Sequence, residues 1–257
     1  MDFKSILEAL FRWFHIIAGV LWIGHLYYFN FVNGQMAAKL SGDTKKAVIP
    51  ELMPRALWWF RWGAAWTWIT GVILLGLVFY MGGNLIEGQA APTTGSFIMV
   101  ALTFLMVFVY DALYKSSLAS NAKQANTIAF VITAVVVFLM HAYGNFSYRA
   151  FNIHTGAMFG TIMAFNVWVR IWPAQQKIIA AIKKGETPPA DLAALAGSRS
   201  KHNTYLSVPL FWMMINAHTT SLSMGGSLAV LPLLVMILVG WHIVFQFYNK
   251  AGKLQGF

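Results

Sequence analysis

The chain has 257 residues, of which 58% are hydrophobic and only 10% are charged, and its formal net charge is +10. Soluble domains carry about 25% charged residues, so much of this surface is expected to face lipid. The chain contains no cysteine, which excludes disulfides, iron–sulfur clusters, thiolate metal sites and covalently attached c-type haem. The excess of positive charge favours anchoring at a cytoplasmic membrane face over nucleic-acid binding.

Apolar stretches of bilayer length recur along the chain, without the strict alternation of barrel strands. Backbone polar groups inside lipid must be satisfied within the segment, so these stretches predict helices. In chain order the predicted spans are 6–31, 56–81, 96–115, 126–146, 150–172, 204–221 and 227–248. A short surface helix is predicted at 190–196, after the turn that follows Lys184. The predicted fold class is an all-α integral membrane protein, a bundle of seven transmembrane helices in one domain, 1–257.

Lysine and arginine collect in alternate loops. The loops at 32–55, 115–125 and 171–203 and the C-terminal tail are basic, whereas 82–95 and 222–226 contain neither residue. The positive-inside rule therefore predicts an N-terminus outside and a C-terminus in the cytoplasm. Tryptophan and tyrosine near the predicted helix ends are typical of interfacial belts: Trp13, Trp58, Trp59, Trp62, Tyr80, Tyr110, Tyr143, Tyr148, Trp172 and Tyr205.

The histidines lie within or beside the apolar spans, where ionisable side chains are costly and are functional candidates. The predicted topology places His15, His141, His154 and His218 in the outer part of the membrane. His25, His202 and His242 fall in the inner part.

Imidazoles at similar depth on different helices are what a membrane b-type haem requires. We therefore predict that His15, His141, His154 and His218 include the ligands of one or two b-type haems, with copper as the weaker alternative. A membrane histidine can also serve only as a hydrogen-bond partner between helices. The spans hold almost no carboxylates, which disfavours a proton-coupled transporter, and Asp111 is expected to pair with Lys115 one turn away.

Several segments resemble one known family over nearly the whole chain. They include Arg12-Trp13-Phe14-His15, Trp59-Phe60-Arg61-Trp62, His154-Thr155-Gly156-Ala157-Met158, His202-Asn203-Thr204-Tyr205 and Asn216-Ala217-His218. The chain resembles the membrane domain of the bacterial urate hydroxylases, also called the urate oxidase N-terminal domain. Full-length members have eight membrane helices followed by a periplasmic cytochrome c domain. They are thought to oxidise urate to 5-hydroxyisourate and to pass the electrons to that cytochrome.

The resemblance implies a membrane-bound oxidoreductase or electron-transfer protein of purine metabolism in the bacterial inner membrane. Because these residues include no cysteine, no cytochrome c domain is expected among them, and a separate periplasmic cytochrome c is the expected partner. His15, His154, His202 and His218 match family histidines and form the set of metal ligands that the resemblance implies. Catalytic residues are not predicted. The alternative is a non-catalytic helical subunit of a larger respiratory or photosynthetic complex, distinguished by the absence of a cofactor of its own.

Overall fold

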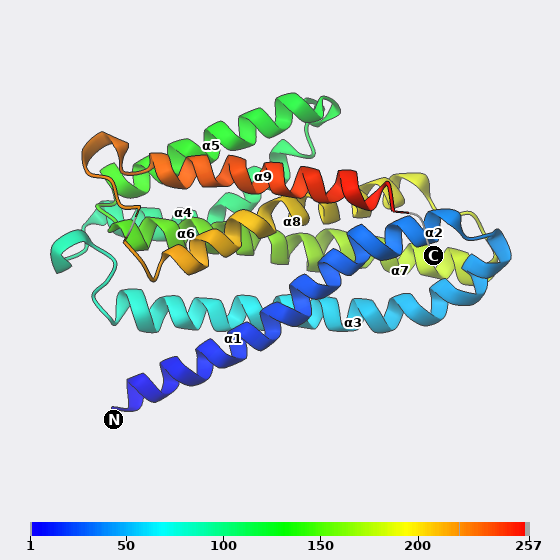
Figure 1. Cartoon of the computed structure of the whole chain (residues 1–257), viewed down its shortest axis with the longest axis horizontal. Helices are drawn as coiled ribbons and strands as arrows, with labels where there is room; N and C mark the ends of the chain where they lie inside the picture. The colour runs from blue at the N-terminus through cyan, green and yellow to red at the C-terminus, as the bar shows by residue number, and fades with distance from the viewer. Residues whose placement is uncertain (1, 221, 255–257) are drawn as a thin grey trace. The chain divides into compact units, whose positions relative to one another are not determined.

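Helices dominate the computed structural model, which describes residues 2–220 and 222–254 (Figure 1). The α-helices are α1 (Phe3–Tyr27), α2 (Gly34–Lys39), α3 (Gly42–Leu75), α4 (Thr94–Leu113), α5 (Ala122–Ala142), α6 (Tyr148–Phe165), α7 (Trp172–Lys184), α8 (Ala190–Asn216) and α9 (Leu231–Ala251). Three π-helical segments continue α1, α3 and α6, at Tyr28–Asn33, Gly76–Tyr80 and Asn166–Ile171. Within the described residues no strand forms, and extended backbone pairs only at an isolated bridge between Ile86 and Phe146. The predicted all-α class is confirmed.

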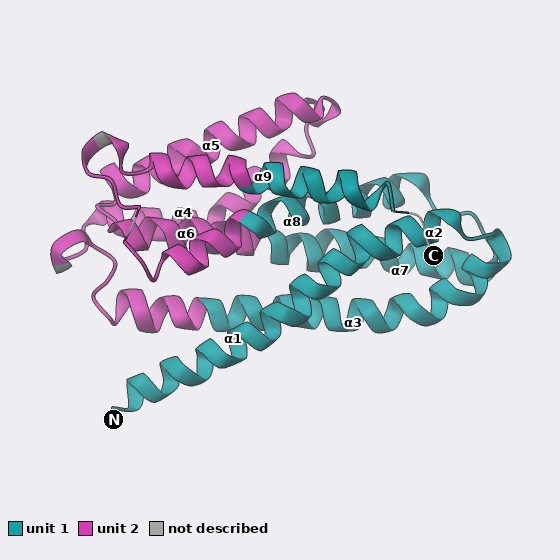
Figure 2. Cartoon of the chain, viewed as in Figure 1, with its two compact units in different colours: residues 1–71, 163–208, 240–257 teal, residues 72–162, 209–239 magenta. Residues whose placement is uncertain are grey.

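The chain divides into two compact units, which are coloured separately in Figure 2. Unit 1 comprises residues 1–71, 163–208 and 240–257, and unit 2 comprises residues 72–162 and 209–239. Unit 1 therefore holds α1, α2, α7 and most of α3 and α8, whereas α4, α5 and most of α6 belong to unit 2. The expectation of one transmembrane domain stays a prediction.

Among the residues that the structure describes, five helical stretches are long and apolar enough to cross a membrane: Phe3–Lys39, Gly42–Tyr80, Thr94–Leu113, Ala122–Ala142 and Leu231–Ala251. They confirm as apolar helices the spans predicted at 6–31, 56–81, 96–115, 126–146 and 227–248. Residues 150–172 are helical, and the span predicted at 204–221 is helical as far as Asn216, but neither is among these five. That they cross the membrane, and the orientation of the chain, stay predictions.

Helix α6 is buried along most of its length, and polar side chains contribute to that buried surface. Asn152, His154 and Thr155 are all completely buried. A helix that is covered by protein can carry polar groups if each finds a partner there. This burial explains why α6 is less apolar than a helix that lipid surrounds.

The predicted short surface helix at 190–196 was wrong as a separate element. Residues 190–216 form one continuous helix, α8, so the predicted break before residue 204 does not exist. Arg199, in the stretch 171–203 that was predicted as a basic loop, lies inside this helix and is only 2% exposed. The helix also ends at Asn216, earlier than the predicted boundary at 221.

In unit 1, α1 and α3 pack closely together at Gly63. A Cβ atom placed there would lie 2.9 Å from the backbone nitrogen of Trp22 and 3.3 Å from the carbonyl oxygen of Ala18. Trp22 is 1% exposed, and beside this contact the rings of Phe29 and Phe60 meet edge to face at 5.3 Å. Only glycine allows this distance between the two helices, as at other small-residue contacts of membrane helices.

We expect Gly63→Ala to push α1 and α3 apart, because backbone atoms cannot move out of the way as a flexible side chain can. Overpacking of this kind lowers the free energy of unfolding by about 1–3 kcal/mol. Thermal unfolding of the purified protein in detergent, followed by circular dichroism, would measure the loss. Gly24→Ala on α1 is the matched control, since a Cβ atom there meets nothing within 4 Å. Equal stability of the two variants would contradict the close approach.

Candidate functional site

His154 on α6 is a completely buried histidine with both ring nitrogens in hydrogen bonds. Nδ1 lies 2.8 Å from the carbonyl oxygen of Ala150, which can only accept. We therefore assign the ring proton to Nδ1. The lone pair on Nε2 then accepts from the hydroxyl group of Tyr80, 3.1 Å away. A backbone carbonyl on Nδ1–H fixes the tautomer that a histidine needs to bind a metal through Nε2.

Aromatic rings surround the imidazole of His154. The ring centroids of Phe146, Tyr80 and Phe79 lie 4.7, 5.8 and 6.1 Å from it. Phe79 and Tyr80 end the π-helical segment that continues α3. Such segments shift the direction of the following side chains and are frequent at functional sites. Here the segment brings two consecutive aromatic residues to the same histidine.

A buried polar network connects the end of α8 to the first turns of α6, the helix that carries His154. The Nδ2 group of Asn216 donates to the hydroxyl oxygen of Tyr148 at 2.6 Å and to Oδ1 of Asn152 at 3.3 Å. Asn152 in turn donates from Nδ2 to the carbonyl oxygen of Tyr148 at 2.8 Å. Asn216 is 4% exposed and Asn152 is fully buried. Buried networks whose members are satisfied fix one arrangement of the helices that carry them.

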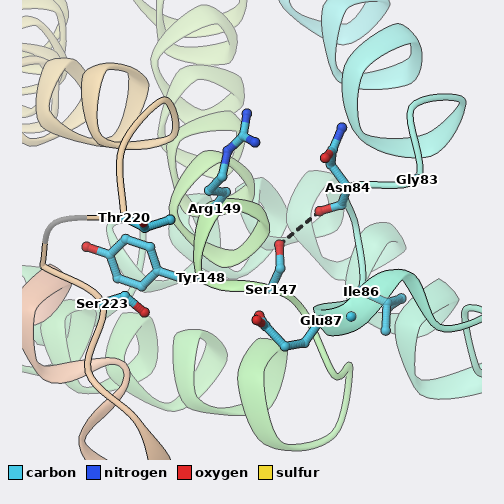
Figure 3. Close-up of a pocket in the computed structure, with 10 residues that line it drawn as sticks. Gly83, Asn84, Ile86, Glu87, Ser147, Tyr148, Arg149, Thr220 and Ser223 are labelled. Carbon is cyan, nitrogen blue, oxygen red and sulfur yellow. Dashed lines mark hydrogen bonds between the residues drawn. The ribbon is translucent and has the colours of Figure 1, made fainter.

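A small open cavity lies at the amino end of α6 in unit 2 (Figure 3). Its volume is about 200 Å³. Three segments line it: the loop that follows α3, the first turn of α6, and the residues after α8. The lining side chains are mainly polar and include Asn84, Glu87, Ser147, Tyr148, Arg149, Thr220 and Ser223.

In unit 1, His15 on α1 makes a comparable hydrogen bond to α3. Its Nδ1 lies 3.0 Å from Oγ1 of Thr70. The Thr70 hydroxyl hydrogen is directed to backbone carbonyls, since Oγ1 lies 2.6 Å from the oxygen of Trp66 and 3.2 Å from that of Thr67. The hydroxyl oxygen is thus the acceptor and His15 Nδ1 the donor. Gly71 makes room for the ring, because a Cβ atom there would lie 3.1 Å from Cε1 of His15.

The other histidines are placed differently. His141 packs its ring on Phe151 at 5.9 Å, and His218 is exposed, two residues beyond the end of α8. His202 is half-buried within α8, although it was expected to precede a span. Nδ1 of His25 lies 2.6 Å from the carbonyl oxygen of Leu21, and Nε2 of exposed His242 lies 3.1 Å from Nε2 of Gln246.

The predicted histidines do not gather into one cluster within a unit. Across residues 2–220 and 222–254, no group of three or more histidine or acidic side chains is placed to hold a metal ion. A haem needs only one or two imidazoles from the protein, so haem ligation does not require such a group. The donor chemistry fits haem at His15 and His154, which both keep a lone pair on Nε2. At His154 the haem iron would have to displace the phenol of Tyr80 from Nε2. Tyr80 is 40% exposed, so its hydroxyl has access to the surface.

Sequence reasoning had assigned Tyr80 to an interfacial aromatic belt and had not identified Thr70, Glu87 or Arg149. No local pattern could have paired Tyr80 with His154, because the two are 74 positions apart. A signal for Thr70 did exist: together with Thr67 and Gly71 it forms a small, polar run in an otherwise apolar and aromatic span.

Tyr80→Phe should destabilise the protein, because it leaves the buried Nε2 of His154 without its donor. An unsatisfied buried acceptor costs about 1–3 kcal/mol, and Phe keeps the ring packing. Thermal unfolding in detergent would measure the change. Tyr143→Phe in the same unit is the control, since Tyr143 is 50% exposed. Adding His154→Phe to Tyr80→Phe should cost less than the sum of the single changes; strict additivity would contradict the hydrogen bond.

The comparisons with known proteins agree with the resemblance seen in the sequence motifs. A family model for the N-terminal part of urate oxidase matches residues 40–256. No curated protein sequence and no solved structure matches the chain. His154, His202 and His218 lie inside the matched residues, whereas His15 precedes them. Since the match covers most of the chain, the chain belongs to the urate oxidase N-terminal family.

Proposed function

We propose that the chain is a membrane oxidoreductase of the urate hydroxylase type that carries b-type haem on membrane histidines. The observation that carries this proposal is that His15 and His154 share the same tautomer, with the ring proton on Nδ1. Each commits Nδ1–H to a hydrogen bond and keeps the lone pair of Nε2. That lone pair of a neutral imidazole is the haem ligand in many proteins. Family membership supports urate as the substrate.

The reaction would convert urate and one water molecule into 5-hydroxyisourate, two protons and two electrons. Bound haem would supply a one-electron carrier between the substrate and the acceptor. The residues of the chain would orient the imidazoles and, around His154, exclude water with Phe79 and Phe146, which are 5% and 1% exposed. The proposed acceptor is a separate periplasmic cytochrome c. His141, His202 and His218 stay predicted ligands, and copper stays the weaker alternative to haem.

Five apolar helices support a multi-pass membrane protein. We place it in the bacterial inner membrane with the basic loops in the cytoplasm, because the basic residues alternate between loops. In that orientation the α6 end that carries the cavity and His154 would face the periplasm, where a soluble cytochrome could collect electrons.

We expect the purified protein to show a b-type α-band in a dithionite-reduced minus oxidised spectrum, with haem b identified by a pyridine haemochrome assay. Anaerobic urate should then produce the same reduced spectrum. A flat spectrum in a protein without copper would refute the proposal and favour the non-catalytic helical subunit.

His15→Ala and His154→Ala should each lower the haem content, because each removes a proposed ligand. His242→Ala is the control, since His242 is exposed and hydrogen-bonds to Gln246 on its own helix. Circular dichroism and gel filtration would verify that each variant is folded. Wild-type haem content in both folded variants would show that the ligands lie elsewhere.

A further inference from the structure

We infer that the cavity at the amino end of α6 is a binding site for a small anion that also carries N–H groups, with Arg149 and Glu87 as its charged contacts. The inference deepens the proposed function and rests on it for the identity of the ligand as urate. Urate has this chemistry: it is a monoanion at neutral pH, with carbonyl oxygens and ring N–H groups around a small heterocycle.

Arg149 and Glu87 line the same cavity, and their charges do not neutralise each other. Both residues line it, yet neither is in an ion pair among the residues that the structure describes. Arg149 uses Nε to donate to the carbonyl oxygen of Ala217. A guanidinium has five N–H donors, so its two terminal nitrogens stay available for an anionic oxygen.

The backbone holds Glu87 in place at the cavity. Ser147 donates from its backbone nitrogen to the carbonyl oxygen of Leu85 and from Oγ to that of Asn84, both at 2.9 Å. The bond between Ser147 and Asn84 is drawn in Figure 3. Gly88, the residue after Glu87, has φ of 65°, a left-handed conformation that favours glycine. The loop is therefore fixed to the first turn of α6, and the carboxylate can accept N–H groups from a ligand beside Arg149.

The size of the cavity restricts the ligand. Sites for drug-sized molecules occupy about 300–1,000 Å³. The present cavity of about 200 Å³ fits a smaller molecule. Asn84, Thr220 and Ser223 add uncharged donors and acceptors around it. Such a lining suits a heterocycle that alternates C=O and N–H groups rather than a simple inorganic anion.

The position of the cavity suits electron transfer to His154. Arg149 and His154 are five residues apart on α6, which is about 8 Å along a helix axis. The ring of Phe79 contacts both, with its centroid 6.0 Å from Cζ of Arg149 and 6.1 Å from the imidazole centroid. A ligand on Arg149 would thus be separated from the proposed haem ligand by a single aromatic ring.

Equilibrium dialysis of the purified protein against radiolabelled urate tests the site without relying on turnover. We expect one urate per chain, and at least a tenfold weaker affinity in Glu87→Gln and Arg149→Gln. Arg149→Lys should bind better than Arg149→Gln, because it keeps the charge. Glu87 is exposed, so Glu87→Gln reports on binding even if the Arg149 variants lose stability with the Ala217 contact. Lys123→Gln and Glu186→Gln are controls, exposed and outside the cavity.

Wild-type affinity in Glu87→Gln and Arg149→Gln would overturn the inference. The inference would also be overturned if urate reduced the haem of the protein but no urate binding were detected. In that case the proposed function would stand without this site. Binding that depends on Glu87 and Arg149 in a protein without haem would support the site and refute the proposed function.

Discussion

A polar side chain that is buried away from water must find its hydrogen-bond partner inside the protein, and this constraint shapes the candidate site. His154 satisfies it with a carbonyl of its own helix and with the phenol of Tyr80 from the end of α3. Asn216 and Asn152 satisfy it with each other and with Tyr148. The bonds from Tyr80 and Asn216 join α6 to the end of α3 and to the end of α8, so they satisfy polar atoms and also help to hold α6 within unit 2.

The same constraint acts at His15, where the hydroxyl oxygen of Thr70 on α3 provides the partner. The Thr70 hydroxyl could have competed as a donor, but the carbonyls of its own helix already accept its hydrogen. The close approach of α1 and α3 at Gly63, two helical turns from Thr70, is what brings His15 within 3.0 Å of that oxygen. Because the hydroxyl hydrogen is directed to the carbonyls, the Thr70 oxygen accepts and the ring proton of His15 lies on Nδ1.

Hydropathy predicted the apolar helices because it is a local property, and the bilayer imposes the same length on each. The predictions from hydropathy were wrong where a helix is surrounded by protein instead of lipid. The stretch 171–203 was predicted as a basic loop, yet Arg199 within it is buried inside the continuous helix α8. The histidines were identified by type and depth, but their partners were not. Tyr80 and Thr70 come from segments far along the chain, and only the fold brings them to His154 and His15.

The two imidazoles differ in access, and this difference bears on how a cofactor would enter. Both hold their ring proton on Nδ1, so neither needs to lose a proton before it can act as a ligand through Nε2. At His15 no hydrogen bond to Nε2 occurs within the described residues, and Gly71 keeps the space beside the ring open. At His154 a ligand must replace the hydroxyl of Tyr80, whose loss would otherwise leave a buried acceptor unsatisfied. Binding at His154 is therefore an exchange of one partner for another. Because the side chain of Tyr80 is partly exposed, its hydroxyl can recover hydrogen bonds at the surface after it is displaced.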